Sequence, residues 1–284
     1  MRATDVAGNT DQTPALRTWT VDTTPPASPA ITSPAEAATI SSGTLTISGT
    51  AEPGSIVELF DGVASKGVTA TSLGGSWSKV VSGLADGSHG FTAMATDAAG
   101  NASGLSSTRT VAVDTTIPDT SIEIGPSDPT TATDAAFEFA ANEPGAAFQC
   151  RLDGGAWATC SSPETRGALA EGAHTFEVRA IDAAGNTDAS PAVWTWSVDL
   201  TAPDTKVDSG PADPTTETQA DFIFSTDDPS ATFECSLDGG GWAPCSSPEA
   251  LTGLAAGTHT FEARAVDPAG NGDPTPAAHT WTVT

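Results

Sequence analysis

The feature that most constrains this chain is a five-residue pattern, Asp-x-Ala-Gly-Asn, that returns at a nearly fixed interval along its 284 residues. The copies begin at Asp5, Asp97, Asp182 and Asp267. Successive copies are therefore 92, 85 and 85 residues apart. Self-similarity at a fixed period indicates a chain of repeated folding units. We refer to this pattern as the turn motif, and each copy marks the same place in a separate unit.

A second pattern, Asp-x-Thr-x-Pro, follows the turn motif at a constant distance, and we refer to it as the linker motif. It opens 17 residues after the first three copies, and the same distance from the fourth copy reaches Thr284, the last residue. Its copies begin at Asp22, Asp114 and Asp199. The predicted domains are residues 23–114, 115–199 and 200–284, and residues 1–22 are predicted to be the C-terminal F–G hairpin of a truncated repeat. Because an isolated hairpin is marginal in water, we expect residues 1–22 to be mobile or to dock opportunistically.

The last two units are near copies of each other. The sequence FQCRLDGGAWATCSSPE at Phe148–Glu164 recurs as FECSLDGGGWAPCSSPE at Phe233–Glu249. The unit at 23–114 is a more distant version without cysteine, although Leu84–His89 matches Leu169–His174 and Leu254–His259. This shared segment predicts one fold for all three units.

Hydrophobic residues alternate with polar ones in short runs. In the third unit Phe137 and Phe139 flank Glu138, and Phe176 and Val178 flank Glu177. Alternation with a period of two is typical of strands with one buried face. Short strands separated by turns rich in Gly, Pro and Asp favour an antiparallel sandwich, and about 85 residues would hold roughly seven strands. The predicted fold class is all-β, with tandem immunoglobulin-like β-sandwich domains in an extended array.

At this point the chain resembles the bacterial Ig-like repeat domains of adhesins and other large surface proteins. The resemblance rests on the linker motif at the start of each unit and on the turn motif before the last strand, and it covers essentially the whole chain. It implies a secreted or cell-surface protein of bacterial origin. The chain departs from antibody domains because it contains no Tyr, and so no tyrosine corner, and because its cysteines do not bridge two sheets.

The four cysteines form two local pairs. Cys150 and Cys160 lie symmetrically about Gly155, and Cys235 and Cys245 repeat that spacing in the next unit. A hairpin that turns at the Gly-rich stretch would place the members of each pair directly across from one another, so two disulfides are predicted. A metal site or a redox pair is the competing interpretation, but there is no CxxC and the histidines occupy other repeat positions. Disulfides imply an oxidising compartment.

Acidic residues are predicted to gather at one pole of each sandwich. In an Ig-like sandwich the first strand starts at the end where the F–G turn lies, and the B–C turn opens at the same end. The linker motif, the turn motif and an acidic residue before Pro in the B–C turn therefore converge. The residues concerned are Asp22, Glu52, Asp97 and Asn101 at the first pole; Asp114, Glu143, Asp182, Asn186 and Asp188 at the second; and Asp199, Asp228, Asp267, Asn271 and Asp273 at the third.

Two interpretations of these poles stay open. Carboxylates that gather within a few ångströms repel one another unless a cation neutralises them, and calcium accepts the six to eight oxygen ligands that loops can offer. Calcium bound there is expected to stiffen the junctions between domains. Alternatively, Asp and Asn only bond to backbone groups in tight turns, with Gly where a positive φ is needed.

Composition and motifs exclude several classes of function. A formal net charge of −26 repels nucleic acid and anionic membranes. No apolar run of about 18 residues is present, so we expect no membrane insertion in this segment. No P-loop, GxSxG or HExxH pattern occurs. His89, His174 and His259 share one repeat position, which favours a structural role over catalysis, and the chain is predicted not to be an enzyme.

The remaining choice is between a spacer and a binding module. Repeats that contact only their neighbours suit a spacer or stalk that holds another domain away from the cell surface. Trp157 and Trp242 match across the cysteine hairpins, and aromatic faces bind sugars, although core packing is the simpler role for Trp. The alternatives are therefore a carbohydrate-binding or adhesive module, with a surface glycan or protein as ligand, and an accessory region of a secreted hydrolase.

Overall fold

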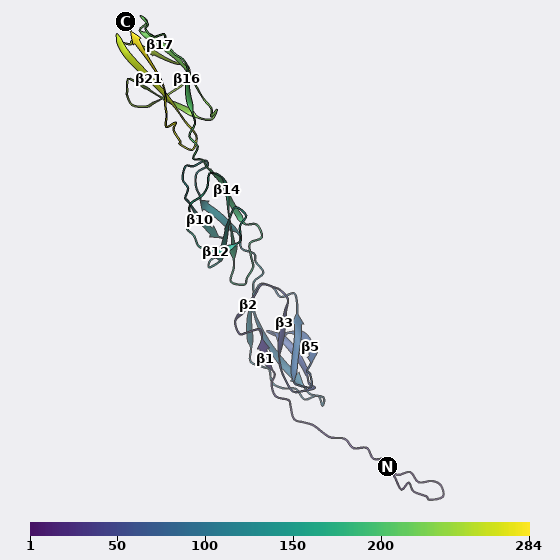
Figure 1. Ribbon diagram of the computed structural model, residues 1–284. Helices are drawn as coiled ribbons and strands as arrows, with labels where there is room; N and C mark the ends of the chain where they lie inside the picture. The colour runs from purple at the N-terminus through teal and green to yellow at the C-terminus, as the bar shows by residue number, and fades with distance from the viewer. The chain divides into compact units, whose positions relative to one another are not determined.

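The computed structural model describes all 284 residues, and its regular elements are 22 β-strands (Figure 1). By their contacts the residues divide into two compact units. One comprises Met1–Thr116 with Ala183–Asn186, and the other comprises Ile117–Asp182 with Thr187–Thr284. We describe three sandwiches in chain order as the second, third and fourth domains.

The second domain is a sandwich of two sheets. One sheet has the order β1-β3-β6 and the other the order β2-β8-β7-β4-β5. The short β2 pairs in parallel with β8, whereas the other pairs are antiparallel. Its strands are β1 (Ala30–Ser33), β2 (Ala38–Ile40), β3 (Leu45–Thr50), β4 (Ile56–Asp61), β5 (Ala64–Ala70), β6 (Ser76–Val81), β7 (Gly87–Thr96) and β8 (Arg109–Val113).

The third and fourth domains repeat one seven-stranded topology. Each packs a three-stranded sheet, β13-β10-β9 or β16-β17-β20, on a four-stranded one, β12-β11-β14-β15 or β19-β18-β21-β22. The third domain holds β9 (Thr120–Ile124), β10 (Ala135–Ala141), β11 (Ala147–Leu152), β12 (Ala158–Cys160), β13 (Glu164–Arg166), β14 (Gly172–Ile181) and β15 (Ala192–Val198). The fourth holds β16 (Thr205–Ser209), β17 (Gln219–Thr226), β18 (Thr232–Leu237), β19 (Ala243–Cys245), β20 (Glu249–Thr252), β21 (Gly257–Val266) and β22 (Ala277–Val283). The predicted tandem all-β sandwiches are confirmed.

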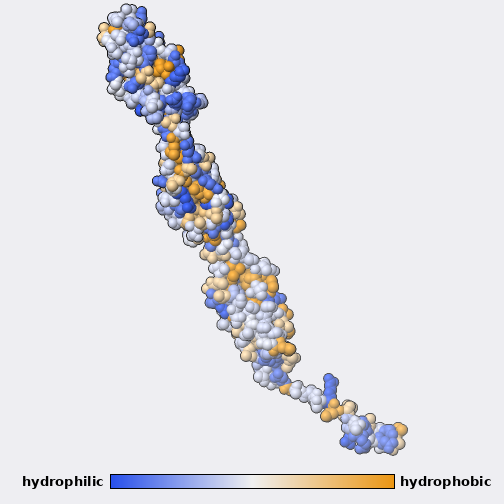
Figure 2. Space-filling model, in the orientation of Figure 1, coloured by the Kyte–Doolittle hydropathy of each residue, from blue (hydrophilic) through white to orange (hydrophobic).

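Each domain has its own hydrophobic core, built from the inward positions of the alternating runs. In the third domain the rings of Phe137 and Phe176 stack at 3.9 Å, and Trp196 meets Phe137 edge-on at 5.3 Å. Phe222, Phe261 and Trp281 repeat this cluster in the fourth domain. Each fully buried Phe contributes about 1.5–3 kcal/mol relative to exposure. Outside the cores, the visible face of each domain mixes hydrophilic and hydrophobic residues (Figure 2), as is normal for protein surfaces.

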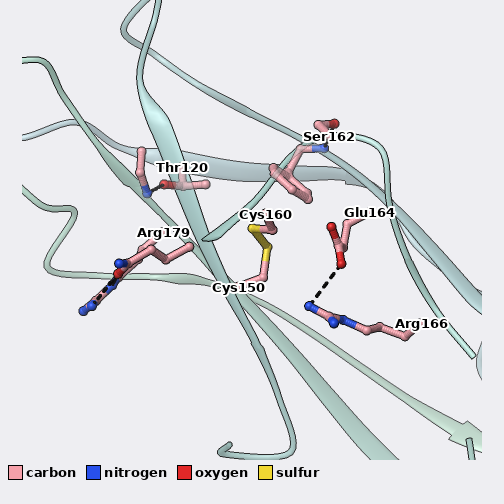
Figure 3. The surroundings of a disulfide bond; sticks show 10 residues. Thr120, Cys150, Cys160, Ser162, Glu164, Arg166 and Arg179 are labelled. Atoms are coloured by element: carbon pink, nitrogen blue, oxygen red, sulfur yellow. Dashed lines mark hydrogen bonds and ion pairs between the residues drawn. A yellow bond between two sulfur atoms is a disulfide. The ribbon is translucent and has the colours of Figure 1, made fainter. Parts of the chain in front are cut away.

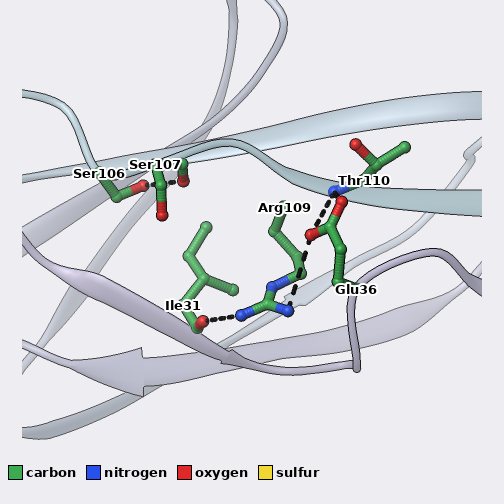
Figure 4. A network of polar contacts seen from close by, with 6 residues as sticks. All are labelled: Ile31, Glu36, Ser106, Ser107, Arg109 and Thr110. Carbon is green, nitrogen blue, oxygen red and sulfur yellow. Dashed lines mark hydrogen bonds and ion pairs between the residues drawn. The ribbon is translucent and has the colours of Figure 1, made fainter.

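The second domain secures its last strand with polar contacts of its own (Figure 4). Arg109, at the start of β8, donates to the backbone oxygen of Ile31 and pairs with Glu36 at 3.6 Å. Glu36 also accepts the backbone N–H of Thr110 at 3.2 Å. The hydroxyl of Ser106 accepts the backbone N–H of Ala93 on β7, at 2.9 Å. These contacts fasten the segment that leads into β8 to both sheets.

Both predicted disulfides are present, but their register differs from the prediction. Figure 3 shows the bond between Cys150 and Cys160. Cys150 lies opposite Ala158 rather than opposite Cys160, so the bond joins diagonal neighbours whose Cα atoms are 5.8 Å apart. The fourth domain has the same offset. The reason is the turn. Asp153 and Gly154 adopt positive φ values of 50° and 69°, which centres the hairpin one residue before Gly155.

The disulfides occur where the hairpin is short. β12 and β19 have three residues each, whereas their counterpart β5 in the cysteine-free second domain has seven. A three-residue strand offers few ladder bonds, and a covalent link between it and the central strand compensates for them. Closing so small a loop contributes about 2–3 kcal/mol. The cysteines therefore stiffen an edge hairpin rather than connect the two sheets.

Residues 1–22 contain the turn of the predicted hairpin but no strands. A single bridge joins Thr4 and Thr10 around the first turn motif. Trp19 is 78% exposed, whereas its counterparts Trp196 and Trp281 are 2% and 0% exposed. The indole of Trp19 belongs to none of the three hydrophobic cores.

Candidate functional site

The turn motif folds around its own aspartate. In the second domain one carboxylate oxygen of Asp97 accepts the backbone N–H groups of Ala99 and Asn101, each at 2.9 Å, and the other accepts the Asn101 amide at 2.8 Å. Gly100 has a φ of 95°, which a side chain would strain. The amide of Asn101 is the largest of the contacts that lower the pKa of Asp97. These are the hydrogen bonds that the tight-turn interpretation expects, and the choice between that interpretation and calcium stays open.

The same asparagine reaches beyond its turn. Its side-chain N–H also donates to the backbone oxygen of the aspartate that opens the linker motif. The three bonds run from Asn101 to Asp22 at 3.2 Å, from Asn186 to Asp114 at 2.8 Å, and from Asn271 to Asp199 at 2.9 Å. The two sequence motifs are therefore the two halves of one contact, which we call the clasp.

The linker motif has an internal structure of its own. The carboxylate of its Asp accepts the backbone N–H of the Thr two residues later, in an Asx turn. The distances are 3.0 Å at Thr24, 3.1 Å at Thr116 and 3.1 Å at Thr201. This bond explains why Asp and Thr recur together at this spacing, and the clasp explains why the turn motif ends in Asn.

Each internal linker is also held from the domain before it, by the loop that precedes the histidine-bearing strand (β7, β14 or β21), here called the E–F loop. In the second domain Asp86 accepts the backbone N–H and hydroxyl of Thr115, at 2.9 and 2.8 Å. In the third domain Glu171 accepts the hydroxyl of Thr201. The bonds from Thr115 hold the pKa of Asp86 below its ordinary value. Sequence reasoning missed Asp86 and Glu171, although both directly precede the shared Gly before the histidine strand.

Carboxylates line open hollows at two of the places where the sequence predicts acidic poles. Asp22, Glu52 and Asp97 line one open hollow of about 470 Å³ in the second domain. Asp199, Asp227 and Asp228 line another, of about 360 Å³, at the start of the fourth domain. In the third domain the half-buried Glu143 and Asp182 bring carboxylate oxygens within 4.8 Å of one another. Hard oxygen donors in such groups could hold a divalent cation, and the part of Asp114 in that group stays a prediction.

Two predicted calcium ligands instead lie inside their domains. Asp188 and Asp273 are each 3% exposed. The carboxylate of Asp273 accepts the backbone N–H groups of Thr205 at 2.9 Å and Thr275 at 2.8 Å, and Asp188 makes the equivalent bonds to Thr120 and Ser190. Burial raises the pKa of Asp273, but the bonds from Thr205 and Thr275 outweigh it and the pKa is lowered. These two carboxylates join the segment between the last two strands (β14 and β15, or β21 and β22) to the first strand of the domain (β9 or β16).

The hairpin tryptophans carry arginine on their rings. The guanidinium groups of Arg151 and Arg179 lie 4.5 and 4.4 Å from the centre of the Trp157 ring, and Arg264 lies 4.4 Å from that of Trp242. Figure 3 shows Arg179 near the disulfide. The rings are half-buried under these side chains, which leaves less open aromatic surface for a sugar than the sequence suggests.

Comparison with known proteins assigns one segment and describes the rest by similarity. Residues 33–115 match the sequence profile of the bacterial Ig-like domain family. Comparison with curated proteins gives no significant match. No helix in the structure is long and apolar enough to cross a bilayer.

Three solved structures are among those to which the chain is similar. The fibronectin(III)-like modules of Clostridium thermocellum CbhA are 20% identical with a TM-score of 0.43, over 60% of this chain and 93% of that one. A 1.5-MDa bacterial ice-binding adhesin is 15% identical with a TM-score of 0.41, over 87% and 94%. A tetra-tandem repeat from the extending region of a large adhesion protein is 23% identical with a TM-score of 0.26, over 84% and 70%. The segment 33–115 is therefore similar to the bacterial Ig-like domain family, and it lies within a chain of tandem β-sandwiches.

Proposed function

We propose that this chain is a non-catalytic spacer or stalk of an extracellular bacterial surface protein, in which each internal linker is held by the domains on both sides of it. The observation that carries the proposal is the clasp, which recurs in three copies between an Asn amide and the opening Asp of the linker motif. A contact repeated at every linker serves a property of the whole array. Limiting the bending of the linkers is such a property, and Pro in each linker motif restricts the backbone further.

The linker between the third and fourth domains is contacted from both domains. Glu171 of the third domain holds Thr201, and Asn271 of the fourth holds the backbone oxygen of Asp199. Three consecutive residues are therefore bound from opposite sides. Rotation about their backbone bonds requires at least one of these contacts to break.

The spacer proposal is tested by replacing the clasp asparagines together, as Asn101→Ala, Asn186→Ala and Asn271→Ala. Small-angle X-ray scattering of the full chain should then show a broader distribution of interatomic distances, while circular dichroism shows intact sandwiches. Asn9→Ala is the matched control, because the first turn motif has the same internal bonds but lies outside the three sandwiches. Scattering curves that superimpose for all variants contradict the proposal.

Calcium at the acidic poles is a second part of the proposal. The convergence of Asp22, Glu52 and Asp97 on one hollow, and of Glu143 and Asp182 in the third domain, supports it. The bonds that already occupy these carboxylates weigh against tight binding. Isothermal titration of the full chain, with Glu143→Ala and Asp182→Ala as variants, decides the matter, and no heat of binding at millimolar calcium contradicts this part.

A carbohydrate-binding or adhesive role is the alternative function, and an accessory role beside a secreted hydrolase is a third. The half-buried Trp157 is the residue that would carry a sugar site. Binding to a glycan array that is lost in Trp157→Ala, with the fold intact, would favour the sugar-binding role over the spacer.

A further inference from the structure

One histidine per domain has the same surroundings in all three domains. It lies near the start of a long inner strand, as His89 on β7, His174 on β14 and His259 on β21. Nδ1 of His174 lies 2.9 Å from a carboxylate oxygen of Asp153, and Nε2 lies 2.8 Å from the backbone oxygen of Ala170. His259 contacts Asp238 and Ala255 at 2.8 Å each, and His89 contacts Asp61 and Ala85 at 2.8 Å each.

These contacts select one protonation state. An ionised carboxylate and a backbone carbonyl only accept hydrogen bonds, and a neutral imidazole carries a single N–H. A neutral ring in this place would therefore turn one nitrogen lone pair toward an oxygen lone pair at about 2.8 Å. Only the imidazolium ion, with two N–H groups, satisfies both contacts. Because the arrangement recurs in the distant second domain as well as in the two near copies, it is a property of the fold rather than of one side-chain placement.

Each of the three rings faces a carboxylate that favours its protonated form, and Lys66, near His89, is the one charged group that opposes it. Asp153 and Asp238 face His174 and His259, and the opposing strands place the uncharged Trp196 and Trp281 across from them. His89 faces Asp61 across from Val111, but Lys66 shares the same oxygen of Asp61 at 3.4 Å. The backbone oxygen and then the carboxylate raise the pKa of His174 and of His259. The pKa of His89 is also raised, mainly by the oxygen of Ala85, while burial and Lys66 oppose the shift.

We propose that these histidines are proton-dependent pins. When protonated, each histidine fastens the E–F loop and the hairpin that precedes it (β4–β5, β11–β12 or β18–β19) to its own strand, and when neutral it releases them. The stabilising contribution of such a group is complete below the ordinary histidine value of about 6.5. It is lost as the pH rises through the higher pKa of the folded state. Each domain is therefore more stable at mildly acidic than at alkaline pH.

The pin also touches the linker, and this part rests on the proposed function. The residue after Ala85 is Asp86 and the residue after Ala170 is Glu171, and these two carboxylates hold Thr115 and Thr201. Release of the E–F loop at alkaline pH removes the support of that contact. Linkers are thus expected to loosen in the pH range in which the pins are lost.

The test is an NMR titration of the four histidines in the folded, unmodified chain. His89, His174 and His259 should titrate above 6.5, with His89 the least shifted of the three because of Lys66. Asp153→Asn keeps an acceptor but removes the charge, so it should lower the titration midpoint of His174 alone. Midpoints at or below 6.5 for the three histidines, or no movement of His174 in Asp153→Asn, overturn the proposal.

Thermal unfolding supplies the second measurement. Between pH 6 and pH 9 the Tm of the unmodified chain should fall, because the stabilising contribution of each protonated histidine is lost over this range. The triple variant His89→Gln, His174→Gln and His259→Gln should have a lower Tm at pH 6 and a smaller fall between the two pH values. A fall as large as that of the unmodified chain overturns the pin. Failure of the asparagine variants to change the scattering would instead overturn the spacer, so the two proposals fail separately.

Discussion

The clasp of the fourth domain gives the sharpest prediction. Asn271→Ala removes two hydrogen bonds, to the carboxylate of Asp267 at 2.7 Å and to the backbone oxygen of Asp199 at 2.9 Å. A bond to a charged group contributes about 1.5–3 kcal/mol and a neutral one about 0.5–1.5 kcal/mol. Because Asn271 is only half-buried, water replaces part of both, and we expect a loss of about 1–2 kcal/mol.

The loss should be local, which suggests the assay. Hydrogen exchange followed by mass spectrometry should show faster exchange around Asp199 and in the turn from Val266 to Asn271, with the strands of the second domain unchanged. The midpoint of the least stable thermal transition should fall by about 4–8 °C per kcal/mol for a domain of 85 residues. Asn9→Ala is the matched control, and its exchange and unfolding outside residues 1–22 should equal those of the unmodified chain. Equal exchange in the two variants would refute the reasoning.

Three further predictions concern single contacts. Cys150→Ser with Cys160→Ser should lower the stability of the third domain by about 2–3 kcal/mol in denaturant unfolding, and an unchanged midpoint would show that the short hairpin is held without its covalent link. Asp273→Ala should cost about 2–3 kcal/mol, because the buried N–H of Thr205 and the partly buried N–H of Thr275 lose their acceptor, so a loss below 1 kcal/mol would count against that role. Since the pKa of Asp273 is lowered, its contribution is present above the ordinary Asp value of 3.8 and disappears as the pH falls further; a fourth domain that keeps its full stability at pH 2 would contradict this sign.

The tandem β-sandwiches could be predicted from the sequence because motifs that recur at a fixed interval mark equivalent places in each repeat. The alternation around Phe137 and Phe139 places both rings in the core, and the same reasoning applies to Phe222 in the next copy. The turn and linker motifs were assigned to one pole, where the structure joins them through Asn271 and its counterparts. Topology carried that inference, since strand order alone decides which turns meet.

The sequence does not show which carboxylate oxygens already accept hydrogen bonds within a domain and which are free to bind a cation. Asp188 and Asp199 look alike as carboxylates near a turn, yet the first is buried against backbone N–H groups and the second opens a linker. The register of the cysteine hairpin was predicted wrongly because the prediction centred the turn on Gly155 by symmetry. The positive φ of Asp153 centres it one residue earlier. Hydrogen-bond occupancy and backbone angles are set by neighbours in space, which spacing along the chain does not reveal.

The central claim is that a linker held from both sides fixes one domain against the next. Residual dipolar couplings measured in the third and fourth domains of the full chain test it most directly. The account predicts that one alignment tensor fits both domains, and that Asn271→Ala combined with Glu171→Ala requires two. Separate tensors already needed for the unmodified chain would contradict it.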